Sequence, residues 1–265
     1  MNTLKYKENW YSYLDIIALV SWSLLLFKYW FNGELYLLIH PNYFLLVLAT
    51  SLLLFILSIA RIIQEFEKLK NRENTNENND NQHTNLLPKG WASSLLVLVA
   101  IFGLITQPIA LTSETAIQRG VGDTLPPTTL ETQSFLNQTP PENRSLIEWV
   151  RTLNAYPEPD NYTGQKANIT GFVVHLDSLP DNYIYLSRFV LTCCAVDAYP
   201  VGIPVELSKS RDEYPPDTWL EIQGAMKTET LLSLESSSPQ REKRQLVLQA
   251  GEVKVISTPP NPYAY

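Results

Sequence analysis

The sequence predicts an α-helical membrane region followed by a mainly β soluble domain, with three transmembrane helices leading into an OB-like, partly closed barrel of five strands. Two segments support the membrane region: residues 43–60 and 91–111 contain no charged side chain over eighteen and twenty-one positions. A shorter apolar segment, residues 16–27, lies near the N-terminus between aromatic residues. Beyond residue 165 the apolar side chains tend to recur at every second position, which is the period of a β-strand.

The three apolar segments are expected to be transmembrane helices. Each of the two longer segments is about the length that crosses a hydrocarbon core of roughly 30 Å. The first segment reaches that length if Trp10 at one end and Trp30 at the other lie at the membrane interfaces, where aromatic side chains concentrate. Bulky residues stand where a signal peptide has its small-residue cleavage site, so we expect this first helix to remain uncleaved.

The distribution of Lys and Arg predicts the orientation of these helices, because short loops rich in basic residues stay in the cytoplasm. The N-terminal tail carries Lys5 and Lys7, whereas residues 31–42 carry no Lys or Arg. The segment between the second and third helices carries Arg61, Lys68, Lys70, Arg72 and Lys89. We therefore expect a multi-pass protein of the cell (plasma) membrane, with a cytoplasmic N-terminus and an extracytoplasmic C-terminal domain.

These features divide the chain into five parts. Residues 1–66 are expected to hold two transmembrane helices. Residues 67–90, which are rich in Asn, are expected to form a disordered cytoplasmic linker, because such a composition buries too little apolar surface to order itself. Residues 91–112 then form the third transmembrane helix, and residues 113–142, with several prolines, form a flexible tether. Residues 143–265 form the extracytoplasmic OB-like β domain.

The β domain is expected to contain one short amphipathic helix and five strands. Apolar residues at helical spacing place the helix at residues 145–153. The strands are expected at residues 166–176, 183–194, 201–207, 218–226 and 245–257. Gly171 and Gly224 lie inside two of these strands, where glycine often marks a bulge or a strong bend. Five strands with internal bends favour a small OB-type barrel, and a five-stranded open sheet is the alternative.

The charge of the chain excludes one class of partner. The net charge is −7, and the part after residue 112 carries the excess, with twelve basic and nineteen acidic residues. An acidic domain cannot neutralise phosphates, so we expect no nucleic-acid partner. The sequence also contains no Walker loop, dinucleotide fingerprint, zincin motif or Gly-x-Ser-x-Gly elbow. We therefore expect no enzymatic activity and assign no catalytic residue.

The two cysteines of the chain, Cys193 and Cys194, are adjacent. Neighbouring side chains of a strand point to opposite faces, so this pair could share one ion only if the strand has ended. Residues 195–200 suggest such an end. Three interpretations stay open at this point. The pair is one buried and one half-exposed thiol, or a site for a soft or borderline metal or metalloid ion, or a redox-active vicinal disulfide.

Three further residue positions are candidates for functional contacts. Asp197 or His175 could supply additional metal ligands beside the thiols. Arg188 could act on a thiol, although its odd separation from Cys193 places it on the opposite strand face, and a surface arginine is the alternative. His40 and Pro41 precede the second apolar helix, where they form either an interfacial boundary or a contact for a partner helix or an ion.

Residues 188–206, RFVLTCCAVDAYPVGIPVE, carry a recognisable pattern. Arg188 and Phe189 precede the pair Cys193 and Cys194, and Asp197 follows it. In this pattern the chain resembles the YcgQ-like family of bacterial membrane proteins. Ala198 also belongs to this pattern. Weaker matches are His40, Pro41, Tyr162, Gly164, Gly171, Phe172 and Val173. The order of membrane helices, tether and β domain fits that family as well.

The resemblance implies an accessory subunit of a two-component membrane permease, whose larger multi-span subunit is of the ArsP-like class. The outer β domain would dock on or gate this partner, with His40 and Pro41 as candidate contacts. The alternative is a membrane-anchored, extracytoplasmic metal-binding, metalloid-binding or thiol redox module that uses Cys193 and Cys194. A plain structural anchor is a further possibility.

Overall fold

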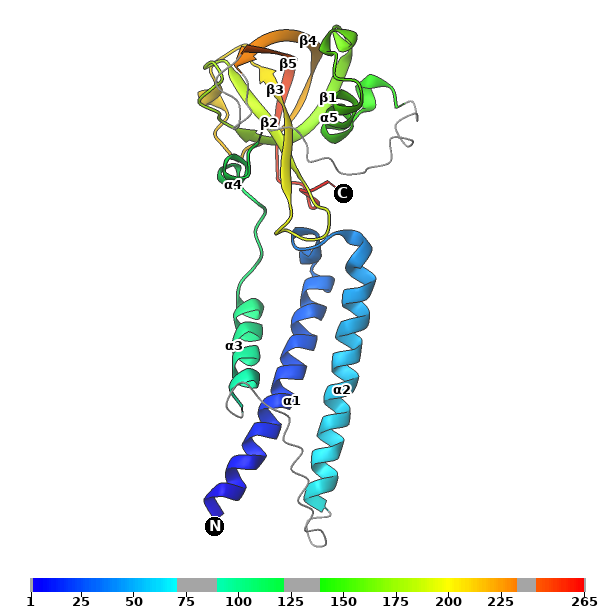
Figure 1. The fold of residues 1–265 in the computed structure, drawn as a ribbon, viewed down its shortest axis with the longest axis vertical. Coiled ribbons are helices and arrows are strands. Elements are labelled where there is room, and N and C mark those ends of the chain that lie inside the picture. The colour runs from blue at the N-terminus through cyan, green and yellow to red at the C-terminus, as the bar shows by residue number, and fades with distance from the viewer. Residues whose placement is uncertain (1, 71–89, 122–138, 233–241, 265) are drawn as a thin grey trace. The chain divides into compact units, whose positions relative to one another are not determined.

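The computed structural model describes residues 2–70, 90–121, 139–232 and 242–264 (Figure 1). The chain divides into two compact units, Met1–Ile109 and Ala110–Tyr265. The first unit is helical, and the second contains the five strands. This order confirms the expected helical region followed by a five-stranded domain. Most of the expected Asn-rich linker and of the expected tether lies outside the described residues.

Helices α1 (Asn2–Phe31) and α2 (Phe44–Lys70) are the two long helices of the first unit. Both are long and apolar enough to cross a membrane, over Ser12–Phe31 and Pro41–Glu67. They coincide with the first two apolar segments of the sequence. The described residues of this unit therefore contain two candidate membrane spans.

Helix α3 (Trp91–Ile105) is shorter than the third expected span, residues 91–112. Its 15 residues extend over about 22 Å, less than a hydrocarbon core of about 30 Å. The helix ends at Ile105 and Thr106 is extended. Pro108 explains the early end, because proline lacks a donor for the helix and keeps the residue before it out of the helical region.

Small residues let α1 pack closely against its neighbours in the first unit. The hydroxyl groups of Ser23 in α1 and Ser51 in α2 each donate to the other residue's carbonyl oxygen at 3.0 Å. On the side of α3, the Tyr29 hydroxyl donates to the carbonyl oxygen of Gly103 at 3.0 Å. A side chain at Gly103 would crowd Leu25 and Tyr29. Such contacts between small and polar residues are typical of helices that associate in a membrane.

The second unit is built on a mixed sheet that closes into a ring in the order β1-β2-β3-β5-β4. The strands are β1 (Lys166–Val174), β2 (Tyr183–Val190), β3 (Tyr199–Glu206), β4 (Trp219–Leu232) and β5 (Glu242–Ile256). All neighbouring strands are antiparallel except β3 and β5, which are parallel. All five expected strands are present, and β4 and β5 are longer than expected.

The parallel pairing between β3 and β5 is the shortest join in the ring. It consists of the pairs Val205↔Leu248 and Glu206↔Gln249. The join between β4 and β5, in contrast, continues from the pair Trp219↔Ile256 to the pair Leu232↔Glu242. Closure of the ring therefore depends on few backbone hydrogen bonds and needs support from side chains near the end of β3.

Helix α5 (Leu146–Ala155) packs against the ring and confirms the helix expected at residues 145–153. Ser145 and Glu148 form a capping box at its N-terminus, which satisfies amides that the first helical turn leaves free. Leu146 and Trp149 are buried in the main hydrophobic core. The core also contains Ile169, Val173, Ile184, Leu186, Ile203, Val205, Leu220, Ile222 and Leu248.

Two details of the β unit differ from the sequence expectation. Strand β2 ends at Val190, four residues before the expected end at residue 194. Helix α4 (Ser113–Gln118) occupies the start of the expected tether. A helix forms there because residues 113–118 contain no proline and their amides find helical acceptors, such as the carbonyl oxygen of Thr112 for the Ala116 amide.

The glycines inside the strands mark places where backbones approach closely. A Cβ atom at Gly171 would lie 2.6 Å from the carbonyl oxygen of Ser187, and one at Gly224 would lie 2.0 Å from that of Gln249. The pairing of β4 with β5 shifts its register between Gln223 and Gly224. The irregularity expected at Gly224 is therefore confirmed, and Gly171 permits a close contact with β2.

Candidate functional site

The candidate site is the Cys loop, residues 191–198, which connects β2 to β3. Cys193 is exposed, Cys194 is half-buried, and both are free thiols. Their sulfur atoms lie 3.5 Å apart. Because β2 has already ended, the two neighbouring side chains are not forced to opposite faces, as they would be in a strand. The loop therefore brings the two thiols together.

Asp197 organises the Cys loop. Its carboxylate accepts hydrogen bonds from the backbone amides of Cys193 at 2.8 Å and of Cys194 at 3.1 Å. The Asp197 amide donates in turn to the carbonyl oxygen of Cys194 at 3.1 Å. One ligand atom from each of these three residues lies within 4.8 Å of the others. The structure thus brings together three of the residues that the sequence indicates as possible metal ligands.

The spacing of the two sulfur atoms suits a shared metal ion. Two thiolates bound to one tetrahedral zinc ion at about 2.3 Å lie about 3.8 Å apart. The observed separation of 3.5 Å is close to this value. A disulfide would need the sulfur atoms at about 2.05 Å. In this geometry the thiols could accept a soft or borderline ion with little rearrangement.

The neighbourhood of the two thiols changes the pKa of both Cys193 and Asp197. Burial raises the pKa of Asp197, but hydrogen bonds from the Cys193 thiol and from nearby backbone amides outweigh it and leave the pKa below its ordinary value. The hydrogen bond to Asp197 and that to Cys194 raise the pKa of Cys193 to about 12. The Cys193 thiol is therefore protonated at neutral pH, and a bound cation would favour the thiolate instead.

His175 is not part of this cluster. Its Nε2 atom lies 2.9 Å from the carbonyl oxygen of Tyr214. The group of possible metal ligands found among the described residues contains the two cysteines and Asp197. Of the four residues named as possible ligands, the structure therefore brings three together.

Arg188 and Phe189 hold the C-terminal strap, residues 261–264. The Arg188 guanidinium donates to the carbonyl oxygens of Asn261 at 2.9 Å and Pro262 at 3.2 Å. Phe189 is buried and packs edge-on against Tyr263, with ring centroids 6.3 Å apart. The guanidinium also lies over the Trp219 ring, 5.8 Å from its centroid. The observed contacts of Arg188 thus order the strap beside β2.

Arg119 contacts the Cys loop from a distant part of the sequence. It follows α4, and its Nη1 atom donates to the carbonyl oxygens of Ala195, at 3.2 Å, and of Ala198. These two carbonyls flank Asp197. Sequence reasoning missed Arg119, because nothing in the pattern around residue 119 indicates which loop the folded chain would place beside it.

His40 and Pro41 belong to the first unit, where they begin the turn that leads into α2. His40 caps this turn, and its Nδ1 atom accepts a hydrogen bond from the Asn42 amide at 3.1 Å. Pro41 occupies the first position of the turn, where a missing donor costs nothing. Both residues have a local structural role, and their contact with a partner stays a prediction.

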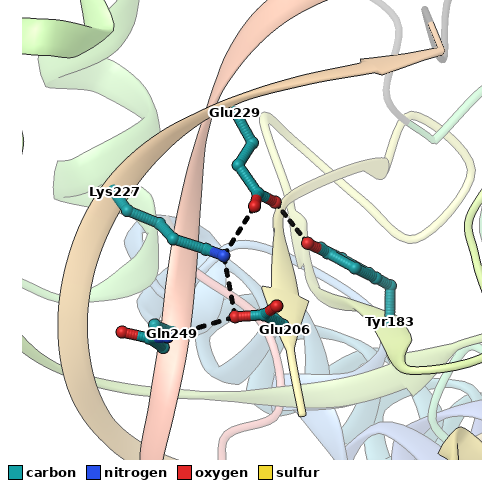
Figure 2. Close-up of polar contacts among 5 residues, drawn as sticks. All are labelled: Tyr183, Glu206, Lys227, Glu229 and Gln249. Carbon is teal, nitrogen blue, oxygen red and sulfur yellow. Dashed lines mark hydrogen bonds and ion pairs between the residues drawn. The ribbon is translucent and has the colours of Figure 1, made fainter.

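A second polar cluster, the seam network, lies at the join between β3 and β5 (Figure 2). The Lys227 ammonium lies 2.7 Å from a carboxylate oxygen of Glu206 and 2.7 Å from one of Glu229. Tyr183 donates its hydroxyl proton to the other oxygen of Glu229, and Gln249 donates to Glu206 at 3.3 Å. Sequence analysis missed this network, although Lys227 and Glu229 alternate along one strand face.

The seam network supports closure of the ring. Its five residues come from β2, β3, β4 and β5, so it ties four strands together where the backbone join is short. A groove of about 430 Å³ opens beside it, with Glu206, Gln249, Gly224 and Gly251 on its walls. The groove lies where β3 ends at Glu206, and Leu207 and Ser208, which follow β3, also line it.

Comparison with protein families agrees with a two-part organisation of the chain. Residues 14–122 match the family model described as the DUF1980 N-terminal domain, and residues 141–265 match the one described as the DUF1980 C-terminal domain. Neither description names a function. No curated protein and no solved structure matches the chain. Because the two matches follow each other in order and cover most of the sequence, the chain belongs to the DUF1980 family.

Proposed function

We propose that this protein is a membrane-anchored, extracytoplasmic module that binds a soft or borderline metal or metalloid ion through Cys193, Cys194 and Asp197. The observation that carries this proposal is the cluster of three ligand atoms within 4.8 Å on a loop where Cys193 is exposed. Thiolates prefer soft and borderline ions, and the carboxylate adds an oxygen ligand. When ionised, the three groups carry three negative charges that a cation would offset.

The incomplete ligand set favours transfer of an ion over permanent storage. Structural zinc sites in proteins are closed by four ligands, whereas three ligands leave a position for water, substrate or another protein. Cys193 is exposed, so such a fourth ligand has access. We infer that the Cys loop captures an ion and presents it to another molecule.

Membrane anchoring is inferred from the first unit. Helices α1 and α2 supply two candidate spans, and α3 is the proposed third crossing. The Lys and Arg residues before and between the spans favour a cytoplasmic N-terminus. With three crossings the Cys loop is extracytoplasmic. We also infer an OB-like barrel for the β unit, which is supported by the number of strands and their closed order.

A second candidate function is that of accessory subunit to a multi-span permease. The resemblance to the YcgQ-like family favours it, and so do the large apolar side chains that α2 and α3 expose. These side chains include Leu45, Leu46, Leu52, Leu53, Phe55, Ile56, Ile59, Ile63, Phe66, Leu95, Leu98, Ile101, Phe102 and Ile105. Lipid or partner helices would cover this surface. The two functions are compatible, because the Cys loop could deliver its ion to such a permease.

Metal binding is tested on the full-length protein in mild detergent, reduced and stripped of metal. Titration with Cd²⁺, followed by the thiolate-to-metal charge-transfer absorption and by elemental analysis, should show one ion per chain. The variant C193S/C194S should lose this ion, and H175A should retain it as a matched control. Equal binding of Cd²⁺ by wild type and C193S/C194S would refute the proposal.

The redox and permease alternatives have separate outcomes. If the pair is a redox couple, a mild oxidant will lower the thiol count from two to none, and a constant count of two excludes this role. Affinity purification from native membranes, followed by mass spectrometry, should recover a multi-span protein in near-equal amount if the chain is a permease subunit. Recovery of the chain alone speaks against that role and leaves the metal site unaffected.

A further inference from the structure

The chain that follows α3 is attached to the ring at several points. This connector, residues 110–121, contains α4 and ends shortly after Arg119. The backbone amide of Leu111 donates to the Tyr263 hydroxyl at 2.9 Å, and the Ser113 amide donates to the Asp217 carboxylate. At the other end of α4, Arg119 binds the Cys loop. The connector is therefore fixed both to the body of the ring and to the candidate metal site.

Arg119 forms hydrogen bonds before and after Asp197, the proposed carboxylate ligand. The guanidinium binds the carbonyl oxygens of Ala195 and Ala198, on either side of Asp197. Hydrogen bonds from a charged donor are about twice as strong as neutral ones. By holding both carbonyls, the guanidinium restricts the turn that directs the Asp197 carboxylate toward Cys193 and Cys194.

We propose that Arg119 is a positioning residue for the metal site and that it couples the ion occupancy of the Cys loop to the connector. This inference rests on the proposed function, which supplies the bound ion. Its geometry comes from the hydrogen bonds of Arg119. An ion that draws Asp197 and the thiolates together also shifts or stiffens the carbonyls of Ala195 and Ala198. Since coupling between sites is reciprocal, an ordered connector in turn favours the bound ion.

The first test compares the Cd²⁺ affinity of full-length variants. R119Q replaces the charged guanidinium by a neutral amide on a shorter stem. We expect the Cd²⁺ affinity to fall about 10-fold with one ion per chain retained, as is typical when a supporting residue of a metal site is lost. R119K keeps a charged donor and should restore most of the affinity. The matched control is R244Q, because Arg244 is bound to Asp160 and Glu158. Wild-type affinity in R119Q would overturn the positioning role.

The second test follows backbone hydrogen exchange with and without Cd²⁺. In the metal-free protein, R119Q should speed exchange of the Cys193 and Cys194 amides, which Asp197 holds in the wild type. On adding Cd²⁺, exchange in residues 113–121 should slow in the wild type and stay unchanged in R119Q. If Cd²⁺ does not change the exchange rate of the connector in the wild type, the coupling is overturned.

The outcomes separate this inference from the proposed function. If the wild type takes up Cd²⁺ and R119Q does so equally well, the metal site stands and the role of Arg119 falls. If the wild type takes up no Cd²⁺, the proposed function and the coupling both fall. Exchange of the Cys193 and Cys194 amides in metal-free R119Q then still decides whether Arg119 shapes the loop: unchanged exchange overturns this part as well.

Discussion

The carboxylate of Asp197 accepts a hydrogen bond from the backbone amide of Cys193 at 2.8 Å, in the loop directly after β2. This contact satisfies an amide that lies beyond the end of β2. It also brings a negative charge next to the thiol of the same residue. The same carboxylate also accepts from the Cys194 amide at 3.1 Å, and a hydrogen bond with the Cys193 thiol is the main cause of the raised pKa of that thiol.

The reactivity of the Cys193 thiol should be low and should depend on Asp197. Because its pKa is raised to about 12, the thiol is protonated at pH 8, and alkylation should be slower than in the unfolded chain. The rate should keep rising with pH above about 8.5, the ordinary pKa of a free thiol. Iodoacetamide labelling of the metal-free C194S variant, followed by mass spectrometry, measures it.

The matched variant C194S/D197N removes the negative charge from beside the thiol. Its Cys193 pKa should fall, and alkylation at pH 8 should accelerate by about tenfold for each unit of pKa lost. An unchanged rate in C194S/D197N would show that another group sets the thiol pKa.

Loss of Lys227 should destabilise the ring. Lys227 is largely buried and bonded to Glu206 and Glu229, so K227M leaves two carboxylates near each other without a shared cation. We expect a loss of about 1–2 kcal/mol in the free energy of unfolding, measured by denaturant titration of the full-length protein in detergent. K209M is the control, because Lys209 and Glu213 form an exposed pair whose loss should cost less than about 0.5 kcal/mol.

The stabilising effect of the seam network should be confined to a window of pH. Burial raises the pKa of Glu229, but bonds from Lys227 and Tyr183 outweigh it and lower the pKa below its usual 4.5. Burial lowers the pKa of Lys227, but its bonds to Glu206 and Glu229 outweigh it and raise the pKa above its usual 10.5. Stability from Glu229 is thus lost as the pH falls through its folded pKa, and stability from Lys227 is lost as the pH rises through its own.

The difference in Tm between wild type and K227M measures this window. It should be constant between about pH 5 and pH 10 and should shrink outside that range. The difference between wild type and K209M should stay near zero throughout. A difference between wild type and K227M that persists unchanged at pH 3 would mean that packing of the Lys227 stem, and not its charge, stabilises the ring.

Replacement of Gly224 should be far more disruptive than replacement of Gly251. A Cβ atom at Gly224 would lie 2.0 Å from the carbonyl oxygen of Gln249, whereas the nearest atom to one at Gly251 would lie 3.3 Å away. We expect G224A to lower the free energy of unfolding by about 2 kcal/mol or more, because β4 and β5 must separate at their register shift. We expect G251A to cost less than about 1 kcal/mol. Equal stability of the two variants would contradict the close approach at Gly224.

The candidate site could be predicted from sequence in part. The cysteines and Asp197 lie within five residues of one another. They can therefore come together once strand β2 has ended before Cys193. The sequence could not predict that His175 lies outside the cluster or that Arg119 contacts the Cys loop. Each of these placements depends on contacts between distant segments. Arg188 was considered as a neighbour of the thiols, and the structure shows it bound to a strap more than seventy residues away.

The sequence by itself determined the features that repeat over a few residues. Runs of apolar side chains located α1 and α2, alternation located the five strands, and apolar residues at helical spacing located α5. Only the tertiary structure decided how the strands close, which residues form the seam network and which connector residue holds the Cys loop. The physical reason is range: periodicity and capping act between near neighbours, whereas the join of β3 with β5 and the contact of Arg119 with Ala198 form only when distant parts of the chain have folded together.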